Sequence, residues 1–187
     1  MTEIPRHKCM VYDGPANWAL RPVALALRKQ LLKNYRCIYL NSEQMVAAFL
    51  SSLRAEGVEV DAEIRRGRLV ASSARPHLID GRFEIDAMLD SLNTEYDRSI
   101  RDGFAGLWAT GDMTWEMGPD QDVTKLLKYE WGLESFINAH PRFGGICQYN
   151  RNTLPAGLVE RASGAHRAIF VNETLSMLNA QFTPLGQ

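Results

Sequence analysis

The sequence lacks the features that mark several large classes of protein. No run approaches the ~18 apolar residues that a membrane-spanning helix needs, and the first residues lack the apolar core of a signal peptide. The three cysteines include no C-x-x-C pair, so reduced thiols are expected rather than a disulfide framework. We therefore expect a cytoplasmic protein that does not associate with membranes.

An excess of either charge sign is also absent. The 21 basic and 22 acidic residues give a net charge of -1, so no overall positive field draws the protein onto nucleic acid. Direct nucleic-acid binding is therefore not expected. The length of 187 residues, 45% of them hydrophobic, suits one packed core, and residues 1–187 are predicted to form a single domain. The oligomeric state stays open, a homo-oligomer included.

The phosphate-binding loop of nucleotide-binding proteins is missing as well. An apolar strand ending at Tyr12 leads into a turn and an amphipathic helix, which is where such a fold has its phosphate loop. The turn Asp13-Gly14-Pro15-Ala16-Asn17 lacks the G-x-x-x-x-G-K-[ST] pattern. Without that lysine and hydroxyl, no ATP is expected as a cofactor, and residual nucleotide-binding ATPase activity is the least favoured function.

What the sequence does contain is an alternation of strand-like and helix-like segments. This pattern is typical of a mostly parallel sheet with helices on both faces, and it predicts an α/β fold. The predicted strands are 8–12, 36–41, 105–110, 143–149 and 167–171, and the predicted helices are 18–33, 42–57, 84–101, 125–139 and 155–163. Residues 58–64 and 68–72 flank an Arg-Gly pair and are predicted as a hairpin or a strand with a polar turn.

Candidate ligand-binding residues follow the predicted strands, because open α/β sheets bind ligands beyond the carboxyl ends of their strands. Aromatic side chains there would wall a pocket, and such walls suit a small apolar or methylated ligand. Asp112 and Glu116 are also the carboxylates nearest the position where an ATPase of such an α/β fold would have its metal-binding acid or catalytic glutamate. The candidates are four aromatic residues and three charged ones: Tyr12, Trp18, Trp115, Tyr149, Asp112, Glu116 and Arg151.

A second group of candidates consists of His7, Cys9 and Cys147. His7 and Cys9 are two apart on a predicted strand, so their side chains face the same side and can share a metal ion. Together with Cys147 they could bind zinc, copper or a haem-type centre in a redox sensor. Two simpler interpretations stay open. Cysteines in apolar strands often act as small hydrophobes, and His7 could be hydrogen-bonded to a carboxylate.

Glu130 is a further candidate for ligand binding. It lies on a predicted helix among Leu126, Leu127 and Leu133, so it is expected to be buried. A buried carboxylate must be paired or protonated, and Arg151 or Arg142 is the expected partner. A structural ion pair and a ligand contact both remain open for it.

Four short motifs, in order along the chain, resemble the MEDS (methanogen/methylotroph sensory) domain family, a derived relative of the RecA/KaiC ATPase fold. Asn150 and the segment Ala165-His166-Arg167 differ from the usual family pattern. The motifs are His7-x-Cys9 with Tyr12, Gly111-Asp112-Met113-Thr114-Trp115, Lys128-Tyr129-Glu130, and Cys147-Gln148-Tyr149-Asn150-Arg151.

The resemblance implies a RecA/KaiC-like domain with a degenerate phosphate loop and no catalytic residues. It implies a sensory function in signal transduction or transcriptional regulation, with a hydrocarbon-derived, one-carbon or methylated compound as the small organic ligand. The expected partner is a regulatory protein of the kinase, anti-sigma or transcription-factor type. The alternative function is the metal- or haem-dependent redox sensor built on His7, Cys9 and Cys147.

Overall fold

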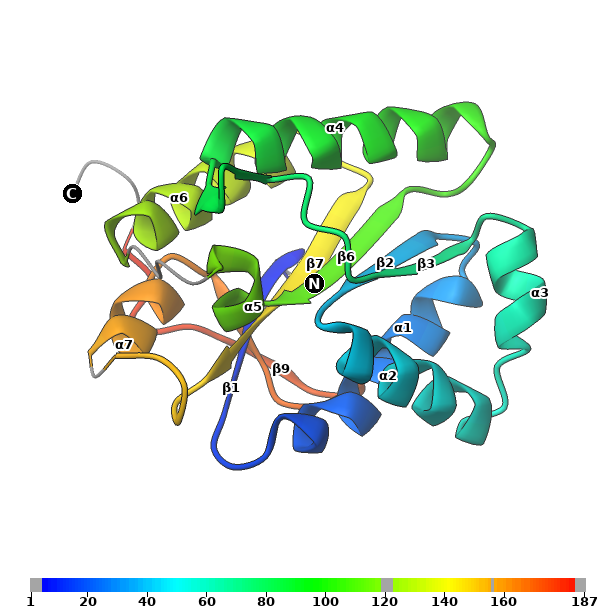
Figure 1. Ribbon diagram of the computed structural model, residues 1–187, viewed down its shortest axis with the longest axis horizontal. Coiled ribbons are helices and arrows are strands. Elements are labelled where there is room, and N and C mark those ends of the chain that lie inside the picture. The colour runs from blue at the N-terminus through cyan, green and yellow to red at the C-terminus, as the bar shows by residue number, and fades with distance from the viewer. Residues whose placement is uncertain (1–4, 119–122, 156, 184–187) are drawn as a thin grey trace.

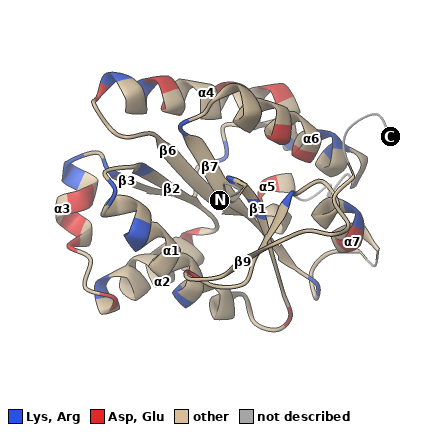
Figure 2. Cartoon of the chain, turned by 180° about the vertical axis from the view of Figure 1, so that it is seen from behind, with Lys and Arg blue, Asp and Glu red and all other residues tan. Residues whose placement is uncertain are grey.

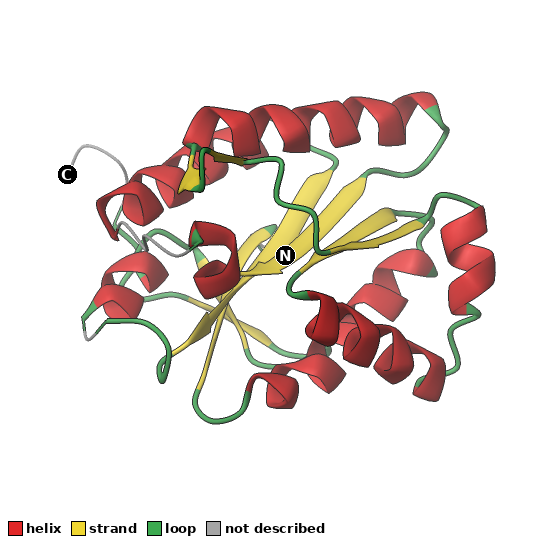
Figure 3. Cartoon of the chain, in the orientation of Figure 1, coloured by secondary structure: helices red, strands yellow, loops and turns green. Residues whose placement is uncertain are grey.

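The fold is built on a seven-stranded sheet with helices on both faces (Figures 1 and 3). The computed structural model describes residues 5–118, 123–155 and 157–183. In the order β3-β2-β6-β7-β1-β8-β9, neighbouring strands are parallel except β8 and β9, so the predicted mostly parallel α/β fold is confirmed. The strands are β1 (His7–Tyr12), β2 (Arg36–Leu40), β3 (Leu69–Ser72), β6 (Leu107–Asp112), β7 (Phe143–Asn150), β8 (Ala168–Phe170) and β9 (Ser176–Leu178).

Charged residues of both signs lie on the helices and in the loops, while the strands carry few (Figure 2). Ser42 caps α2, because its hydroxyl accepts a hydrogen bond from the Met45 amide at 3.4 Å. No helix within the described residues is long and apolar enough to cross a membrane. The helices are η1 (Ala16–Ala19), α1 (Leu20–Leu31), α2 (Glu43–Ala55), α3 (Val60–Arg65), α4 (Ile85–Arg101), α5 (Met113–Met117), α6 (Val123–Ala139) and α7 (Leu158–Ser163).

Two hydrophobic cores form because successive side chains of a strand point to opposite faces of the sheet. On one face, α1 and α2 cover Met10 of β1 and Ile146 of β7. On the other, α4, α5, α6 and α7 cover Cys9, Cys147 and Tyr149. His7, Cys9 and Cys147, which were predicted to share a metal ion, therefore lie on the face of the sheet that α6 covers.

The prediction for residues 58–64 is wrong. Instead of a strand they contain helix α3, and β3 then pairs in parallel with β2 rather than forming a hairpin. The helix is held at its end by Glu63, which accepts hydrogen bonds from Arg66 at 3.2 Å and from Arg68 at 2.6 Å. Two short elements were also not predicted: the β4 (Leu78–Ile79) and β5 (Arg82–Phe83) hairpin, and strand β9.

Close packing of β7 against its neighbours determines which residues meet. β1 and β7 pair in a register that places Cys9 opposite Cys147 and His7 opposite Gly145. Gly145 allows β6 to approach, because a Cβ atom there would lie 2.3 Å from the backbone oxygen of Ala109. The strands that carry the candidate residues are thus held at the centre of the sheet.

Candidate functional site

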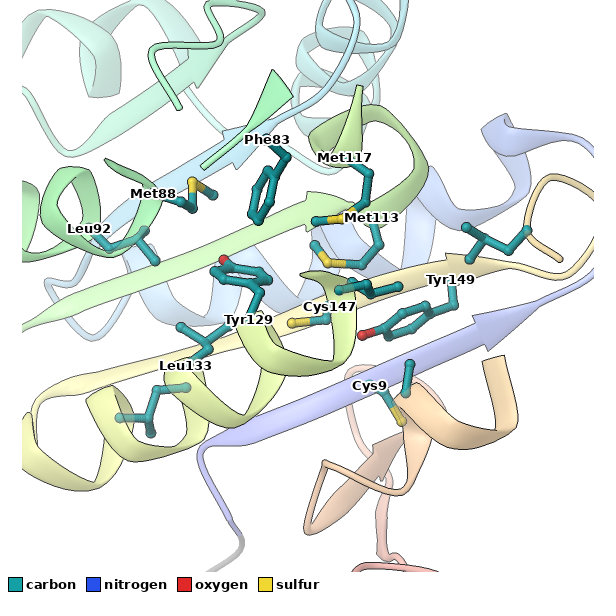
Figure 4. Packing of buried hydrophobic residues seen from close by; sticks show 14 of the residues in the cluster. Cys9, Phe83, Met88, Leu92, Met113, Met117, Tyr129, Leu133, Cys147 and Tyr149 are labelled. Atoms are coloured by element: carbon teal, nitrogen blue, oxygen red, sulfur yellow. The ribbon is translucent and has the colours of Figure 1, made fainter. Parts of the chain in front are cut away.

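A cluster of buried polar side chains lies between the sheet and helix α6. We call it the buried polar cluster. Figure 4 shows part of its surroundings, with Cys147 and Tyr149 on β7 and Cys9 on the adjacent strand. Its members come from four different segments, and each is at least nine-tenths buried. They are His7 of β1, Glu130 and Glu134 of α6, Cys147 and Tyr149 of β7, and His166, which follows α7.

Glu130 is at the centre of this cluster. Its Oε1 accepts a hydrogen bond from the Tyr149 hydroxyl. Its Oε2 lies 3.4 Å from Nε2 of His7, 3.2 Å from Nε2 of His166 and 3.6 Å from Sγ of Cys147. The expected pairing of Glu130 with Arg151 or Arg142 is wrong, because the two histidines and Tyr149 occupy its oxygens.

Glu134 orients His7 from the other side. One turn of helix after Glu130, its Oε2 lies 3.0 Å from Nδ1 of His7. Its Oε1 accepts a hydrogen bond from Nε of Arg167 at 2.7 Å. His7 therefore has a carboxylate at each ring nitrogen. A hydrogen bond between His7 and a carboxylate was one of the interpretations that the sequence left open, and Glu134 provides it.

His166 has an unusual environment for a fully buried histidine. Its Nδ1 donates a hydrogen bond to the carbonyl oxygen of Ala162 at 2.9 Å. Because a carbonyl can only accept, the proton of the neutral ring lies on Nδ1, and Nε2 carries a lone pair. That Nε2 faces Glu130 but has no hydrogen-bond partner among the described residues. In this tautomer Oε2 of Glu130 and Nε2 of His166 are two acceptors that lie 3.2 Å apart.

The electrostatics of the cluster follow from these contacts. Burial alone would raise the pKa of Glu130, but His166 and His7 lower it well below its usual range. Burial would likewise lower the pKa of His7, but Glu130 and Glu134 raise it above its ordinary value. For His166, burial and the nearby charge of His7 lower the pKa. In the metal-free cluster, His7 is accordingly the imidazole that holds a positive charge.

Cys9 and Cys147 are poorly suited to thiol redox chemistry. Burial raises the pKa of Cys9 to about 12, and burial with the neighbouring carboxylate Glu130 raises the pKa of Cys147 well above its ordinary value. Reactive thiols require the opposite shift. Cys147 lies 3.6 Å from Nε2 of His7, as a shared metal site would require. Cys9 faces the same side but is not among the residues whose ligand atoms come together with those of His7.

A small cavity adjoins the cluster. Its volume is about 30 Å³, and most of its lining is apolar side chains of α4, α6 and the central strands. The polar side chains of His7, Glu116 and Cys147 also line it. Glu116 is buried, its Oε2 has no hydrogen-bond partner among the described residues, and burial raises its pKa well above the ordinary value. A haem group does not fit in a space of this size.

The aromatic residues that were predicted to line one pocket lie in different parts of the structure. Trp18 is 66% exposed, Tyr12 is half-buried with its hydroxyl 3.4 Å from Asp112, and Trp115 packs under the guanidinium of Arg75. None of them lines the cavity beside the cluster. Of the four aromatic candidates, Tyr149 contacts the buried polar cluster.

The remaining charged candidates lie at the carboxyl ends of strands, apart from the cluster. Asp112 caps the short helix α5, since its Oδ1 accepts a hydrogen bond from the amide of Trp115 at 3.0 Å. Arg151 is exposed and lies 3.5 Å from Asp13. Both contacts are structural.

Sequence reasoning did not identify His166 or Glu134. The signal for Glu134 was its position four residues after Glu130, on the same helix face. For His166 no local pattern exists, because it is brought to His7 by the return of the chain from α7 to β8 beside β1. The ring centroids of His7 and His166 lie 4.1 Å apart.

The fold and the site together define an α/β domain of RecA-like type with a degenerate phosphate loop. A solved structure, the flagellar accessory protein FlaH from Methanocaldococcus jannaschii, is similar to it, with a TM-score of 0.59. The identity is 12%, and the match covers 89% of this chain and 71% of that chain. Comparison with curated proteins returns no match. Residues 6–167 match the MEthanogen/methylotroph, DcmR Sensory domain, and the chain therefore belongs to the MEDS family.

Proposed function

We propose that this chain is a non-catalytic sensory domain that binds a one-carbon or methylated compound beside the buried polar cluster. The cavity lined by His7, Glu116 and Cys147 is the observation that carries the proposal. Its volume of about 30 Å³ leaves room for roughly one or two small heavy atoms. Apolar walls around a few polar groups are the usual composition of a small-molecule site. Membership in a sensory family supports the same function.

Glu116 supplies the polar contact that such a ligand would make. Burial raises the pKa of Glu116 and so favours the protonated carboxyl, which can donate a hydrogen bond. The unpartnered Oε2 costs free energy until a ligand atom satisfies it. A compound with one carbon and one oxygen, nitrogen or halogen atom fits both the apolar walls and this acid.

Transmission of the signal requires a second component. The described helices and strands all belong to one α/β domain, so we assign the output to a regulatory partner of the kinase, anti-sigma or transcription-factor type. The cavity is lined by Met88 and Leu92 of α4 and by Leu133 of α6. A ligand there would favour one packing of these helices on the sheet and shift the population that the partner binds.

Calorimetry and thermal unfolding of the full chain test the binding. We expect saturable binding of methanol or methylamine, and none of butanol or butylamine. Glu116→Met, which keeps the side-chain length but removes the acid, should weaken binding about tenfold, the loss of one hydrogen bond. Glu43→Met on the exposed face of α2 is the control. Equal binding of the butyl compounds, or no effect of Glu116→Met, would contradict the proposal.

A further inference from the structure

Four ligand atoms of the buried polar cluster converge on one point. They are Nε2 of His7, Oε2 of Glu130, Sγ of Cys147 and Nε2 of His166, and all lie within 4.8 Å of one another. Each belongs to a residue that is at least 95% buried. Nitrogen, sulfur and carboxylate oxygen are the donors that zinc takes in proteins, whereas calcium and magnesium take oxygen.

Four of the six distances between these atoms are close to those expected around a tetrahedral ion. With bond lengths of about 2.0 Å to nitrogen or oxygen and about 2.3 Å to sulfur, ligand atoms of a tetrahedron lie about 3.3–3.6 Å apart. The separations from Oε2 of Glu130 are 3.4 Å to His7, 3.2 Å to His166 and 3.6 Å to Cys147. His7 and Cys147 are 3.6 Å apart. The two remaining separations, from Nε2 of His166 to His7 and to Cys147, are at most 4.8 Å, so a cation at the centre needs only small side-chain movements to contact all four.

The outer contacts of both histidines favour the same interpretation. Metal-binding histidines almost always donate their second ring N–H to a carboxylate or a backbone carbonyl, which fixes the tautomer. Nδ1 of His7 is bonded to Glu134, and Nδ1 of His166 is bonded to the carbonyl of Ala162. Each ring therefore presents Nε2 to the common point, and Nε2 of His166 is left without a hydrogen-bond partner among the described residues.

We propose that His7, Glu130, Cys147 and His166 bind a divalent transition-metal ion of the zinc type. Two neutral imidazoles, one carboxylate and one thiolate neutralise the ion, so a buried site carries no net charge. Binding displaces one proton from the Cys147 thiol and one from the His7 imidazolium. His7 also lines an outer hollow of about 190 Å³ with Arg6, Glu134 and Arg167, which offers a route for the ion. The site deepens the proposed function, because it would hold two residues of the ligand cavity in place.

Cobalt titration of the full chain tests the site. After removal of bound metal with a chelator, Co²⁺ should bind with one equivalent, and its spectrum should contain tetrahedral d–d bands and a thiolate charge-transfer band. Cys147→Ser should abolish the charge-transfer band, and His166→Gln should weaken Co²⁺ affinity by roughly 100-fold or more. Added Zn²⁺ should displace the cobalt.

Cys9→Ser is the matched control, because Cys9 lies opposite Cys147 in the sheet but outside the set of four ligands. It should leave the stoichiometry and the spectrum unchanged. Circular dichroism checks that each variant is folded. Where a ligand variant does not fold, Glu134→Gln is measured in its place. It should weaken Co²⁺ affinity about 10- to 100-fold through the orientation of His7.

Two results would overturn the metal site: folded wild-type protein that takes up no stoichiometric Co²⁺, or a charge-transfer band that survives Cys147→Ser. Repeating the one-carbon titrations on the Zn²⁺-loaded and metal-free protein distinguishes failure of the metal site from failure of the proposed function. Metal uptake without one-carbon binding upholds the site and refutes the small-molecule sensor. One-carbon binding without metal uptake does the reverse.

Discussion

Glu130 is a single residue on which the buried polar cluster depends. Its carboxylate is fully buried, and it contacts His7, His166, Cys147 and Tyr149. An isolated charge in such a place is strongly unfavourable, and the His7 imidazolium together with the Tyr149 hydroxyl offsets that cost. The stability of the cluster therefore depends on a charge that was expected to pair with an arginine.

Glu130→Gln tests this dependence. Glu130→Gln removes one of the two carboxylates that pair with the buried His7 imidazolium and leaves Glu134 as the other, so we expect the metal-free protein to lose about 3 kcal/mol of unfolding free energy at neutral pH. Urea unfolding in a chelator measures it. Glu56→Gln is the control, because Glu56 pairs with the exposed Arg21 at 2.9 Å, and such pairs contribute less than about 1 kcal/mol. Equal losses in both variants would contradict this account.

The residues of the cluster differ in how readily their role could be predicted from the sequence. His7, Cys9 and Cys147 were predicted as a shared metal site, of which His7 and Cys147 belong to the cluster and Cys9 does not. The burial of Glu130 followed from its leucine neighbours. His166 could not be found, since its contact with Glu130 spans 36 positions of sequence and depends on the path from α7 into β8. Residues on one strand or helix share a predictable face, whereas contacts between distant segments are decided by tertiary packing.

At the scale of elements, helix α6 is the part of the fold that builds the cluster. It places Glu130 and Glu134 one turn apart, so both carboxylates point at β1. Burial opposes ionisation of Glu134, but His7 and Arg167 lower its pKa to about 2 from an ordinary 4.5. α6 is thus joined to β1 and to the chain after α7 by charged contacts.

Acid should weaken these contacts. A carboxylate with a lowered pKa stabilises the fold above its unfolded pKa of 4.5, and this contribution is lost as the pH falls toward about 2. In the metal-free protein, we expect the urea midpoint to fall more steeply between about pH 5 and pH 3 in the wild type than in Glu134→Gln. Glu160→Gln, at an exposed position of α7, should behave like the wild type. Parallel curves for all three proteins would refute the assignment.

Strand β7 depends on glycine for its position in the sheet. Gly145→Ala would place a Cβ atom 2.3 Å from the carbonyl oxygen of Ala109, and backbone cannot move aside cheaply. We expect a loss of about 3 kcal/mol in urea unfolding, at the upper end for overpacking. In the control Gly57→Ala, the Cβ meets open space at a φ of +79°, and the left-handed backbone costs about 1–2 kcal/mol. A smaller loss at Gly145 than at Gly57 would argue against close strand packing as the constraint.

The elements of the fold were predictable where the local pattern decides them. The strand prediction for 143–149 matches β7, because a continuous apolar run is typical of a buried parallel strand. Helix α3 was missed because its formation depends on Glu63 meeting Arg68 of the next segment. Strand β9 was missed because its side chains are mostly exposed and it pairs only with β8 among the described strands.

For the molecule as a whole, the fold is RecA-like, and the turn after β1, where nucleotide-binding α/β proteins have a phosphate loop, is differently built. Gly14, at a φ of +97°, lies against the ring of Trp18, and its carbonyl accepts a hydrogen bond from Asn150 at 3.0 Å. The polar chemistry lies instead under α6, within the core. Binding at the carboxyl ends of the strands, which the sequence predicted, is therefore replaced in our proposals by a site on the face of the sheet.

Nucleotide binding should be absent on these grounds. The loop supplies neither the lysine nor the hydroxyl that hold phosphates and Mg²⁺, so millimolar Mg-ATP should leave the thermal unfolding midpoint unchanged. Ligand at 100 times its Kd would add about 2.7 kcal/mol, so binding would be detected readily. Trp18→Ala, which uncovers Gly14, should restore nothing, because removing a cover does not supply the missing groups. Saturable stabilisation of either protein by Mg-ATP would contradict this and favour a nucleotide-dependent sensor, and an active RecA-like ATPase in the same assay serves as the positive control.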